Sequence, residues 1–389
     1  MNPQTSKSDF FISTADWHFG KRKYGLKHLE QDRYDAAWQI VKYAAEKGAK
    51  FILNGGDLLD VTRPGSAAVV ELGKIHAFLV EHSIPMYLVQ GNHDKSDPPW
   101  FSLFDTSSAG GIKLLNGNIV EEKVMCGETT RTLTITGYDE TPREKLKEKL
   151  NKAPSTDILL LHAATKEFFS FPTERTFCVK DDVPKDKYKL IVVGDIHVSE
   201  AKSIGKSICL SPGSIEVGER SEARQKYFWT HTMQGGSWVD KKVSLVVRNT
   251  IDLMILTEDS VEEGLKKMED ADALGSTIHF YYNPEIPGIV ERVLAKRKNP
   301  NTYVAPEAAH TTDNDDATAV EIANAESVED LLPLTSFICD FTDDEIVEAA
   351  AKVLLDAYSK PNIDDVLNTL AEATFQELSD SQTEEKEAV

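Results

Sequence analysis

Val89-Gln90-Gly91-Asn92-His93-Asp94 is the stretch that decides the fold of this chain. It closes an apolar run that begins at Pro85, and it ends in an amide, an imidazole and a carboxylate in a row. Such side chains are poor core material, but they suit the mouth of a buried strand, where a parallel sheet delivers functional groups to a crevice. The alternative is a plain turn, because Gly-Asn is common turn chemistry. The rest of the chain decides between a turn and a site.

Four other apolar runs end in the same kind of side chain. Helical patterns separate several of the runs, and strand–helix–strand alternation is typical of a parallel sheet. A single Asp or His at a strand end is more often a cap or a surface residue, but five such ends favour a site at one end of one sheet. The four runs and their polar ends are Asp9–Ala15 with Asp16 and His18, Lys50–Asn54 with Asp57, Asp157–Leu161 with His162, and Lys189–Val193 with Asp195 and His197.

These side chains suit the hydrolysis of a phosphodiester, which repels anionic nucleophiles and has a poor alkoxide leaving group. Two divalent metal ions about 3.5–4 Å apart meet both problems, because they activate a water molecule and clamp the phosphoryl oxygens. Such a pair needs a bridging carboxylate with nitrogen and oxygen ligands around it. One further imidazole, outside the metal shell, can protonate the leaving oxygen. The pattern therefore predicts a two-metal phosphodiesterase.

Five motifs in this order resemble those of the calcineurin-like metallophosphoesterase family. They span roughly residues 9–215, and they are Asp16-x-His18, Gly56-Asp57, Gly91-Asn92-His93-Asp94, His162 and Gly194-x-x-His197. Within that family the chain is most similar to SbcD-type recombination and repair nucleases, the nuclease half of a complex with an SbcC-type, SMC-like ABC ATPase. The turn Pro212-Gly213-Ser214 after the last motif supports this narrower resemblance.

The resemblance implies an α/β fold, a metallophosphoesterase β-sandwich flanked by helices, with a small α+β capping domain and a C-terminal helical partner-binding segment. It also implies a double-strand exonuclease and single-strand endonuclease that acts on DNA, and a homodimer. It assigns seven residues to two divalent metal ions: Asp16, His18 and His197 to one, Asn92, His162 and Asp195 to the other, and Asp57 as the bridge. His93 would be a histidine outside the metal shell that stabilises or protonates the leaving group, and Asp94 would orient His93.

One motif position departs from the family, whose last motif is usually Gly-His-x-His. Here it reads Gly194-Asp195-Ile196-His197. A carboxylate can replace an imidazole as a ligand, and its charge and hardness favour manganese, or magnesium as the alternative, over softer ions. The other reading is a weakened metal site. We expect Asp195 to remain a ligand.

The motifs and the composition together predict five segments. They are a nuclease domain over 1–247, a DNA-capping α+β domain over 248–304, an acidic linker over 305–330, a helical ATPase-binding segment over 331–380 and a disordered acidic tail over 381–389. The formal net charge of −21 would argue against a nucleic-acid partner if it were evenly spread. However, residues 305–389 hold 22 acidic and 3 basic side chains, whereas the first 304 residues hold 42 and 40. The acidity therefore says nothing against a DNA-binding face on the front part.

Two basic runs are candidates for contact with a phosphate backbone. Lys21-Arg22-Lys23 follows the first motif, and Lys296-Arg297-Lys298 lies in the predicted capping domain. A basic triplet is usually a solvated loop, but next to a metal site it is also where DNA phosphates need neutralising.

The C-terminal segment carries two apolar stripes at helical spacing. Thr342-Asp343-Asp344-Glu345 resembles a capping box and Pro361 ends the first helix. The stripes include the candidate partner-binding residues Ile346, Val353, Leu354, Val366, Leu367 and Leu370. Such helices either fold back on the body or dock on a partner, and the preceding linker favours the partner.

Three observations bear on compartment. The four cysteines lie apart with no Cys-x-x-Cys pair, which suits a reducing compartment and disfavours a cysteine zinc site. The N-terminal residues have no apolar signal region, and no run reaches 18 apolar residues. We therefore expect a cytoplasmic protein without a membrane segment.

Two other functions fit parts of the sequence. A phosphoesterase of the same fold that acts on small nucleotides or phosphoproteins would need neither a basic capping unit nor partner helices. A non-catalytic scaffold for the ATPase would not need the full ligand set. Cleavage of linear duplex DNA with manganese, compared with a generic phosphodiester dye, separates these hypotheses.

Overall fold

The structure is a computed structural model that describes residues 8–23, 27–96, 99–104, 108–168, 176–218, 222, 224–234 and 237–308. The chain forms two compact units. The first comprises Met1–Leu253, Glu262–Phe280 and Glu291–Ala305, and the second comprises Met254–Val261, Tyr281–Val290 and the residues from Pro306 onward. All of the predicted metal ligands belong to the first unit.

One six-stranded sheet carries the first three predicted strand ends. Its order is β12-β11-β1-β2-β3-β4, in which β1 to β4 are parallel while β11 and β12 are antiparallel neighbours. The strands are β1 (Phe10–Thr14), β2 (Ile52–Asn54), β3 (Pro85–Leu88), β4 (Gly111–Leu114), β11 (Tyr227–Gln234) and β12 (Ser237–Ser244). The parallel strands bring the residues after β1, β2 and β3 to the same edge.

A second six-stranded sheet carries the other two strand ends, in the order β5-β6-β7-β8-β10-β9. Its strands are β5 (Val120–Cys126), β6 (Thr129–Tyr138), β7 (Ile158–His162), β8 (Leu190–Gly194), β9 (Glu200–Ile204) and β10 (Ser207–Ser211). The expectation that all five strand ends belong to one sheet was therefore wrong, because apolar runs reveal buried strands but not which sheet they join. The sandwich implied by the family resemblance is confirmed.

The core is divided into layers by the two-residue period of the strands. In β1, Phe11 packs between the sheets while Ile12 faces the helices. In β7, Ile158 and Leu160 face the same inter-sheet core, and Leu159 packs in the outer layer. Strands that are apolar on both faces are typical of a sheet covered on both sides.

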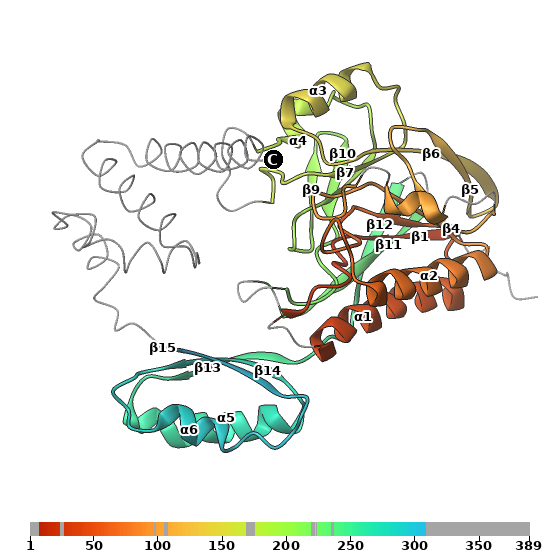
Figure 1. Cartoon of the computed structure of the whole chain (residues 1–389). Coiled ribbons are helices and arrows are strands. Elements are labelled where there is room, and N and C mark those ends of the chain that lie inside the picture. Colours follow the sequence, from red (N-terminus) through yellow and green to blue (C-terminus); the bar gives the residue numbers. More distant parts are fainter. Residues whose placement is uncertain are drawn as a thin grey trace, which may run out of the picture. The chain divides into compact units, whose positions relative to one another are not determined.

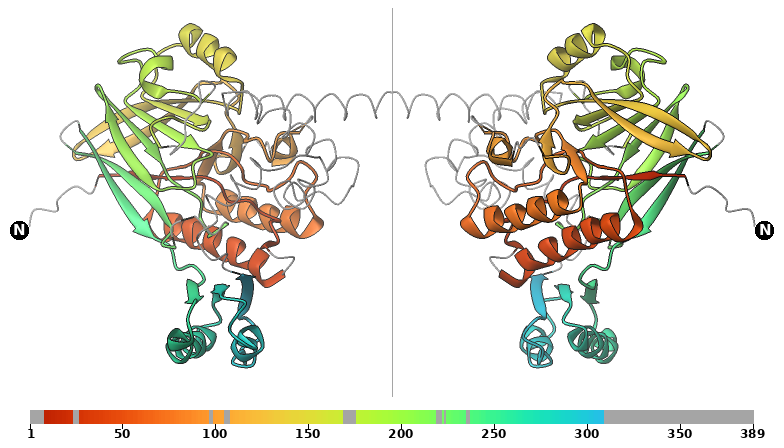
Figure 2. Two further views of the ribbon diagram at one scale, coloured as in Figure 1. Left: turned by 90° about the vertical axis from the view of Figure 1, so that its left-hand side faces the viewer. Right: turned by 90° about the vertical axis from the view of Figure 1, so that its right-hand side faces the viewer.

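Helices cover the outer faces of the sandwich. In α1, Tyr34, Ala37, Val41 and Ala44 recur at helical spacing and are buried in the layer against the first sheet. Figures 1 and 2 show α1 and α2 side by side on one side of the sandwich and α3 on the other. The helices are α1 (Lys27–Lys47), α2 (Ser66–Glu81), α3 (Arg143–Lys152) and α4 (Val179–Asp182), with the 3-10 turn η2 at Trp100–Phe104.

The predicted α+β segment contains a three-stranded sheet in the order β13-β14-β15 (Figure 1). Its elements are β13 (Thr250–Ile255), η3 (Glu258–Ser260), α5 (Val261–Ala273), β14 (Thr277–Tyr282), α6 (Ile289–Leu294) and β15 (Tyr303–Ala308). The sequence did not predict β15, which continues four residues into the predicted linker. No helix in the described part of the chain is both long and apolar enough to cross a membrane.

Candidate metal centre and active site

The polar residues at the five strand ends come together from both sheets. Side-chain atoms that can bind a metal lie within 4.8 Å of one another in three overlapping groups. The groups are Asp16 with His18 and His197, Asp16 with Asp57 and His162, and His18 with Asp60 and His93. Six residues of the predicted constellation therefore meet in space, and Asp60 is an addition that the sequence did not single out.

The first group is centred on His18. Its Nε2 atom lies 3.3 Å from Nε2 of His197 and 3.9 Å from Oδ2 of Asp57. Asp16 is fully buried, and its Oδ1 accepts a hydrogen bond of 3.0 Å from the main-chain nitrogen of Asp195. Its Oδ2 has no hydrogen-bond partner among the described residues. A buried carboxylate oxygen without a partner is costly, and a bound cation would satisfy it.

The second group surrounds the ring of His162. Its Nδ1 lies 2.8 Å from the main-chain oxygen of Gly55, which can only accept, so Nδ1 carries the proton. Its Nε2 lies 3.0 Å from Oδ1 of Asn92 and 3.8 Å from Oδ1 of Asp195. In this tautomer a nitrogen lone pair and two oxygen acceptors face one another, an arrangement that suits a cation.

Asp57 lies between the imidazoles of His18 and His162. Its Oδ2 is 3.5 Å from Nε2 of His162 and 3.9 Å from Nε2 of His18, and its Oδ1 accepts a 3.0 Å hydrogen bond from the main-chain nitrogen of His93. A carboxylate near both imidazoles has the position of a bridging ligand. Nitrogen, carboxylate and amide donors together fit divalent ions such as manganese or magnesium, so the residues present fit the metals that the family implies.

Four of the predicted ligands adopt a left-handed backbone conformation. The φ angles are 53° at Asp16, 49° at His18, 52° at Asp57 and 76° at Asp195. This region is unfavourable for residues with a Cβ atom, and such strain clusters at functional sites. All four stand within four residues of a strand end, where the chain leaves the sheet.

Glycines keep room for these side chains. A Cβ atom at Gly91 would lie 1.9 Å from Oδ1 of Asp57, and one at Gly56 would lie 2.5 Å from Nδ1 of His162. Gly56 also has a φ of 102°, which favours glycine. The glycines in the Gly-Asp and Gly-Asn-His-Asp motifs are therefore needed for close packing around the ligands.

His93 lies beside the predicted metal ligands but is held by other groups. Its ring is perpendicular to that of His18, with centroids 4.9 Å apart, and its Nδ1 lies 2.7 Å from the main-chain oxygen of Asp60. The buried Asp94 carboxylate accepts hydrogen bonds of 2.7 Å from the main-chain nitrogens of Gly91 and Leu58. Asp94 thus ties the loop that bears His93 to the loop that bears Asp57, and any orientation of His93 by Asp94 acts through these main chains.

Two carboxylates that lie against predicted ligands were not singled out in the sequence. Asp60 Oδ1 lies 3.2 Å from Nδ1 of His18, and Glu222 Oε1 lies 2.8 Å from Nδ1 of His197. Asp60 is three residues after Asp57, so its position in the Gly-Asp motif was a usable signal. Glu222 stands alone in the sequence and offered none.

The cluster of charges shifts the pKa values of the site. Burial raises the pKa of Asp16 to about 6 and lowers the pKa of His18 to about 4. Burial acts to lower the pKa of His162, but the carboxylates of Asp57 and Asp16 outweigh it and raise that pKa. Burial thus disfavours the charged form of Asp16, and a cation beside its carboxylate would offset that cost.

A cleft of about 440 Å³ opens next to the second group. Asn92, His162 and Asp195 line it together with Arg143. The Arg143 guanidinium is fixed by Asp182, with Nε–Oδ2 and Nη2–Oδ1 distances of 2.7 and 3.1 Å. The Arg143 charge is already paired and the wall also holds Glu140 and Asp195, so metal ions at the predicted ligands would supply the positive charge that an anionic substrate needs.

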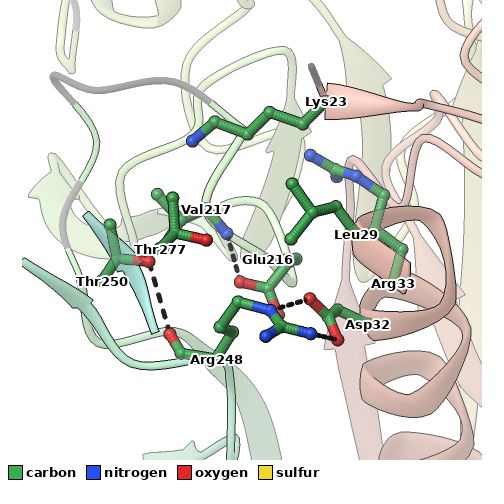
Figure 3. Close-up of a pocket in the computed structure, with 9 residues that line it drawn as sticks. All are labelled: Lys23, Leu29, Asp32, Arg33, Glu216, Val217, Arg248, Thr250 and Thr277. Carbon is green, nitrogen blue, oxygen red and sulfur yellow. Dashed lines mark hydrogen bonds and ion pairs between the residues drawn. The ribbon is translucent and has the colours of Figure 1, made fainter. Parts of the chain in front are cut away.

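The basic residues of the first run differ in their surroundings. Lys21 is half-buried, and Arg22 is exposed with Nε 2.5 Å from a carboxylate oxygen of Glu30. Burial lowers the pKa of Lys23 to about 8. Figure 3 shows Lys23 and Arg33 lining a small pocket, with Arg248 paired to Asp32.

The second basic run follows α6. Lys296 Nζ lies 2.7 Å from Oε1 of Glu269, whereas the side chains of Arg297 and Lys298 are exposed. The structure therefore leaves Arg297 and Lys298 on the surface. All six candidate partner-binding residues, from Ile346 to Leu370, lie outside the described residues.

Comparison with known proteins agrees with this geometry. Residues 11–199 match the model of the calcineurin-like phosphoesterase family, a range that contains all seven predicted ligands. Residues 11–199 are thus a calcineurin-like metallophosphoesterase domain, and the chain is a metal-dependent phosphoesterase. The resemblance seen in the motifs is confirmed.

The individual proteins that resemble this chain narrow the comparison beyond the family. Three of them share the name DNA double-strand break repair protein Mre11. The chain is 26% identical over 269 residues to the protein of Thermoplasma acidophilum, covering 66% of this chain and 68% of that one. It is 25% identical over 267 residues to that of Sulfolobus acidocaldarius, covering 67% and 68%. For Methanocaldococcus jannaschii the identity is 26% over 284 residues, covering 67% and 73%.

Proposed function

We propose that this chain is a DNA nuclease that hydrolyses phosphodiester bonds with two divalent metal ions, manganese rather than magnesium, in DNA repair. The observation that carries the proposal is the position of His93. Its imidazole lies against the ring of His18 while its Nδ1 is held by the main chain of Asp60. A histidine next to a ligand set but bonded elsewhere suits proton transfer to a leaving oxygen.

The ligand roles implied by the resemblance are consistent with the distances. Asp16, His18 and His197 would hold one metal ion, and Asn92, His162 and Asp195 the other. Asp57, within 4 Å of an imidazole on each side, would bridge them. When bound, the two ions activate a water molecule and neutralise the phosphoryl oxygens.

The chain's own residues would supply the remaining chemistry. A carbonyl oxygen can only accept, so the bond to Asp60 places the proton of a neutral His93 on Nδ1 and leaves Nε2 for the leaving oxygen. As an imidazolium, His93 would donate its Nε2 proton to that oxygen and keep the bond to Asp60. The fixed main chain around Asp94 would hold the ring in place during this transfer.

Two observations support DNA as the substrate: the names of the relatives and the basic side chains on the surface. The Mre11 relatives are named for double-strand break repair. Arg297 and Lys298, exposed near the end of α6, and Lys21 and Arg22, close behind the first motif, are our candidates for contact with DNA phosphates. We further propose an SbcC-type ATPase partner, a homodimer and a cytoplasmic location.

The function is tested with metal-stripped protein, manganese and two substrates. We expect nucleotides to be released from labelled linear duplex DNA and a generic phosphodiester dye to be hydrolysed, both only when manganese is present. Cleavage of the dye with no attack on DNA would show a phosphoesterase for small substrates instead. If His93→Ala keeps both activities at the wild-type level, His93 is not the proton donor.

The partner proposal has its own test. Leu367→Asp with Leu370→Asp should abolish co-purification of the ATPase while dye hydrolysis stays at the wild-type rate. If the double variant instead lowers the melting temperature of the isolated protein, the segment belongs to the body of the protein and the docking proposal is wrong.

A further inference from the structure

His197 has a carboxylate behind it. Its Nδ1 atom lies 2.8 Å from Oε1 of Glu222, while its Nε2 lies 3.3 Å from Nε2 of His18 in the ligand set. A carboxylate accepts from Nδ1–H and thereby leaves the lone pair on Nε2, the nitrogen that faces the other ligand. The Glu222 contact thus selects the tautomer that a metal needs.

Glu222 is itself fixed on its other oxygen. Oε2 accepts hydrogen bonds from Lys226 Nζ at 2.5 Å, Ser214 Oγ at 2.9 Å and the main-chain nitrogen of Gly218 at 3.1 Å. Lys226 Nζ also lies 2.8 Å from Ser214 Oγ. The side chains of Glu222 and Lys226 are only 7% and 2% exposed. The carboxylate therefore cannot rotate away from His197 without breaking a buried network.

We propose that Glu222 is a positioning residue for the metal ligand His197, held in place by Lys226 and Ser214. The proposal rests on the proposed role of His197 as a ligand. The ion pair with Lys226 uses only Oε2 of Glu222. The other oxygen, Oε1, is directed at the ring of His197. Carboxylates that orient a ligating histidine raise its basicity and fix its ring, and their loss typically weakens metal binding about 10- to 100-fold.

The chain offers a matched control in a second histidine–carboxylate pair. Nδ1 of His231 lies 2.7 Å from Oδ1 of Asp240, but Nε2 of His231 bonds to Ser13 Oγ at 2.8 Å rather than facing the ligand set. Both histidines are held by a carboxylate in the same way. Asp240→Ala therefore removes the same contact without touching a proposed ligand.

The experiment titrates manganese alone into the metal-stripped full-length chain and follows binding by calorimetry. We expect Glu222→Ala to weaken one of two manganese sites about 10- to 100-fold and to leave the other unchanged. Asp240→Ala should leave both sites unchanged. Wild-type manganese affinity at both sites in folded Glu222→Ala would overturn the proposal.

Two further variants separate positioning from folding, because Glu222→Ala leaves Lys226 buried without its carboxylate. Glu222→Gln keeps an amide oxygen that can accept from His197 and should recover affinity to within a few-fold of wild type. Glu222→Ala with Lys226→Met removes both charges but restores no acceptor, so binding should stay weak. Full recovery in this double variant, or a lowered melting temperature of the metal-free protein with unchanged affinities, would mean a structural role only.

The variant His197→Ala separates a failure of the positioning role of Glu222 from a failure of the ligand role of His197. Weak binding in His197→Ala with normal binding in Glu222→Ala contradicts only the positioning role. Normal binding at both sites in His197→Ala contradicts the ligand assignment on which the proposal rests.

Discussion

The ring of His93 is held by the main chain of Asp60, with 2.7 Å between Nδ1 and the carbonyl oxygen. The carboxylate of the same Asp60 lies 3.2 Å from Nδ1 of His18. One residue therefore contacts both a proposed metal ligand and the proposed proton donor. The Gly-Asp loop and the Gly-Asn-His-Asp loop act as one unit in this site.

Removal of the His93 imidazole should slow hydrolysis without loss of metal. General acid catalysis contributes about 100- to 10,000-fold, so His93→Ala should lower kcat on a phosphodiester dye by that range. Manganese affinity should stay within a few-fold of wild type. His82→Ala is the control, because Nδ1 of His82 also bonds to a main-chain oxygen, that of Phe78 at 2.9 Å, at the end of α2. Equal losses in both variants would rule out a specific role for His93.

Asp195 should be required despite its departure from the family pattern. Asp195→Ala removes an oxygen that lies 3.8 Å from Nε2 of His162 and should reduce metal-dependent hydrolysis on the order of 100-fold or more. Asp195→His restores the usual motif and should keep activity while shifting preference toward softer ions such as zinc. Activity near the wild-type level in Asp195→Ala would contradict its role as a ligand.

A methyl group at Gly91 should displace the Asp57 carboxylate. Its Cβ would meet Oδ1 of Asp57 at 1.9 Å, so Gly91→Ala should lower the free energy of unfolding by about 1–3 kcal/mol and weaken manganese binding. Gly73→Ala in α2 is the control, since no heavy atom lies within 4 Å of its added Cβ. That change should stabilise the helix by about 0.5–1 kcal/mol. Urea unfolding and metal titration measure both effects, and a harmless Gly91→Ala would show that the loops have more room than the structure gives them.

Glu216 should make the stability of the protein depend on pH. Burial raises the pKa of its carboxyl from 4.5 to about 7. Between these values the folded state keeps a proton that the unfolded state has released, so the free energy of unfolding falls as the pH rises through this window. The contribution is at most about 1.4 kcal/mol per pH unit.

Glu216→Gln removes that titration. The variant should lose this part of the slope between pH 4.5 and 7 and should be more stable than wild type at pH 8, as measured by urea unfolding of the metal-free protein. Figure 3 shows Glu216 in the pocket with Lys23 and Arg33, and it is not one of the proposed ligands. An unchanged slope in Glu216→Gln would mean that other groups set the pH dependence.

Much of the site could be predicted because its residues follow apolar strands directly. Asp16, Asp57 and Asp195 each stand within three residues of a strand end, where the carboxyl ends of parallel strands meet. The division into two sheets could not be predicted from the apolar runs themselves, since the run before Asp195 looks the same in either sheet, and only the family resemblance implied a sandwich. Glu222 was missed because its contact with His197 depends on how distant segments pack, not on a local pattern.

The most direct test of the two-metal centre is electron paramagnetic resonance of the metal-stripped chain as manganese is added. We predict two manganese ions per chain with a spin-coupled spectrum, because the Asp57 carboxylate would bridge them, and we predict loss of the coupling in Asp57→Asn. A single uncoupled manganese ion per chain at saturation would contradict the two-metal centre.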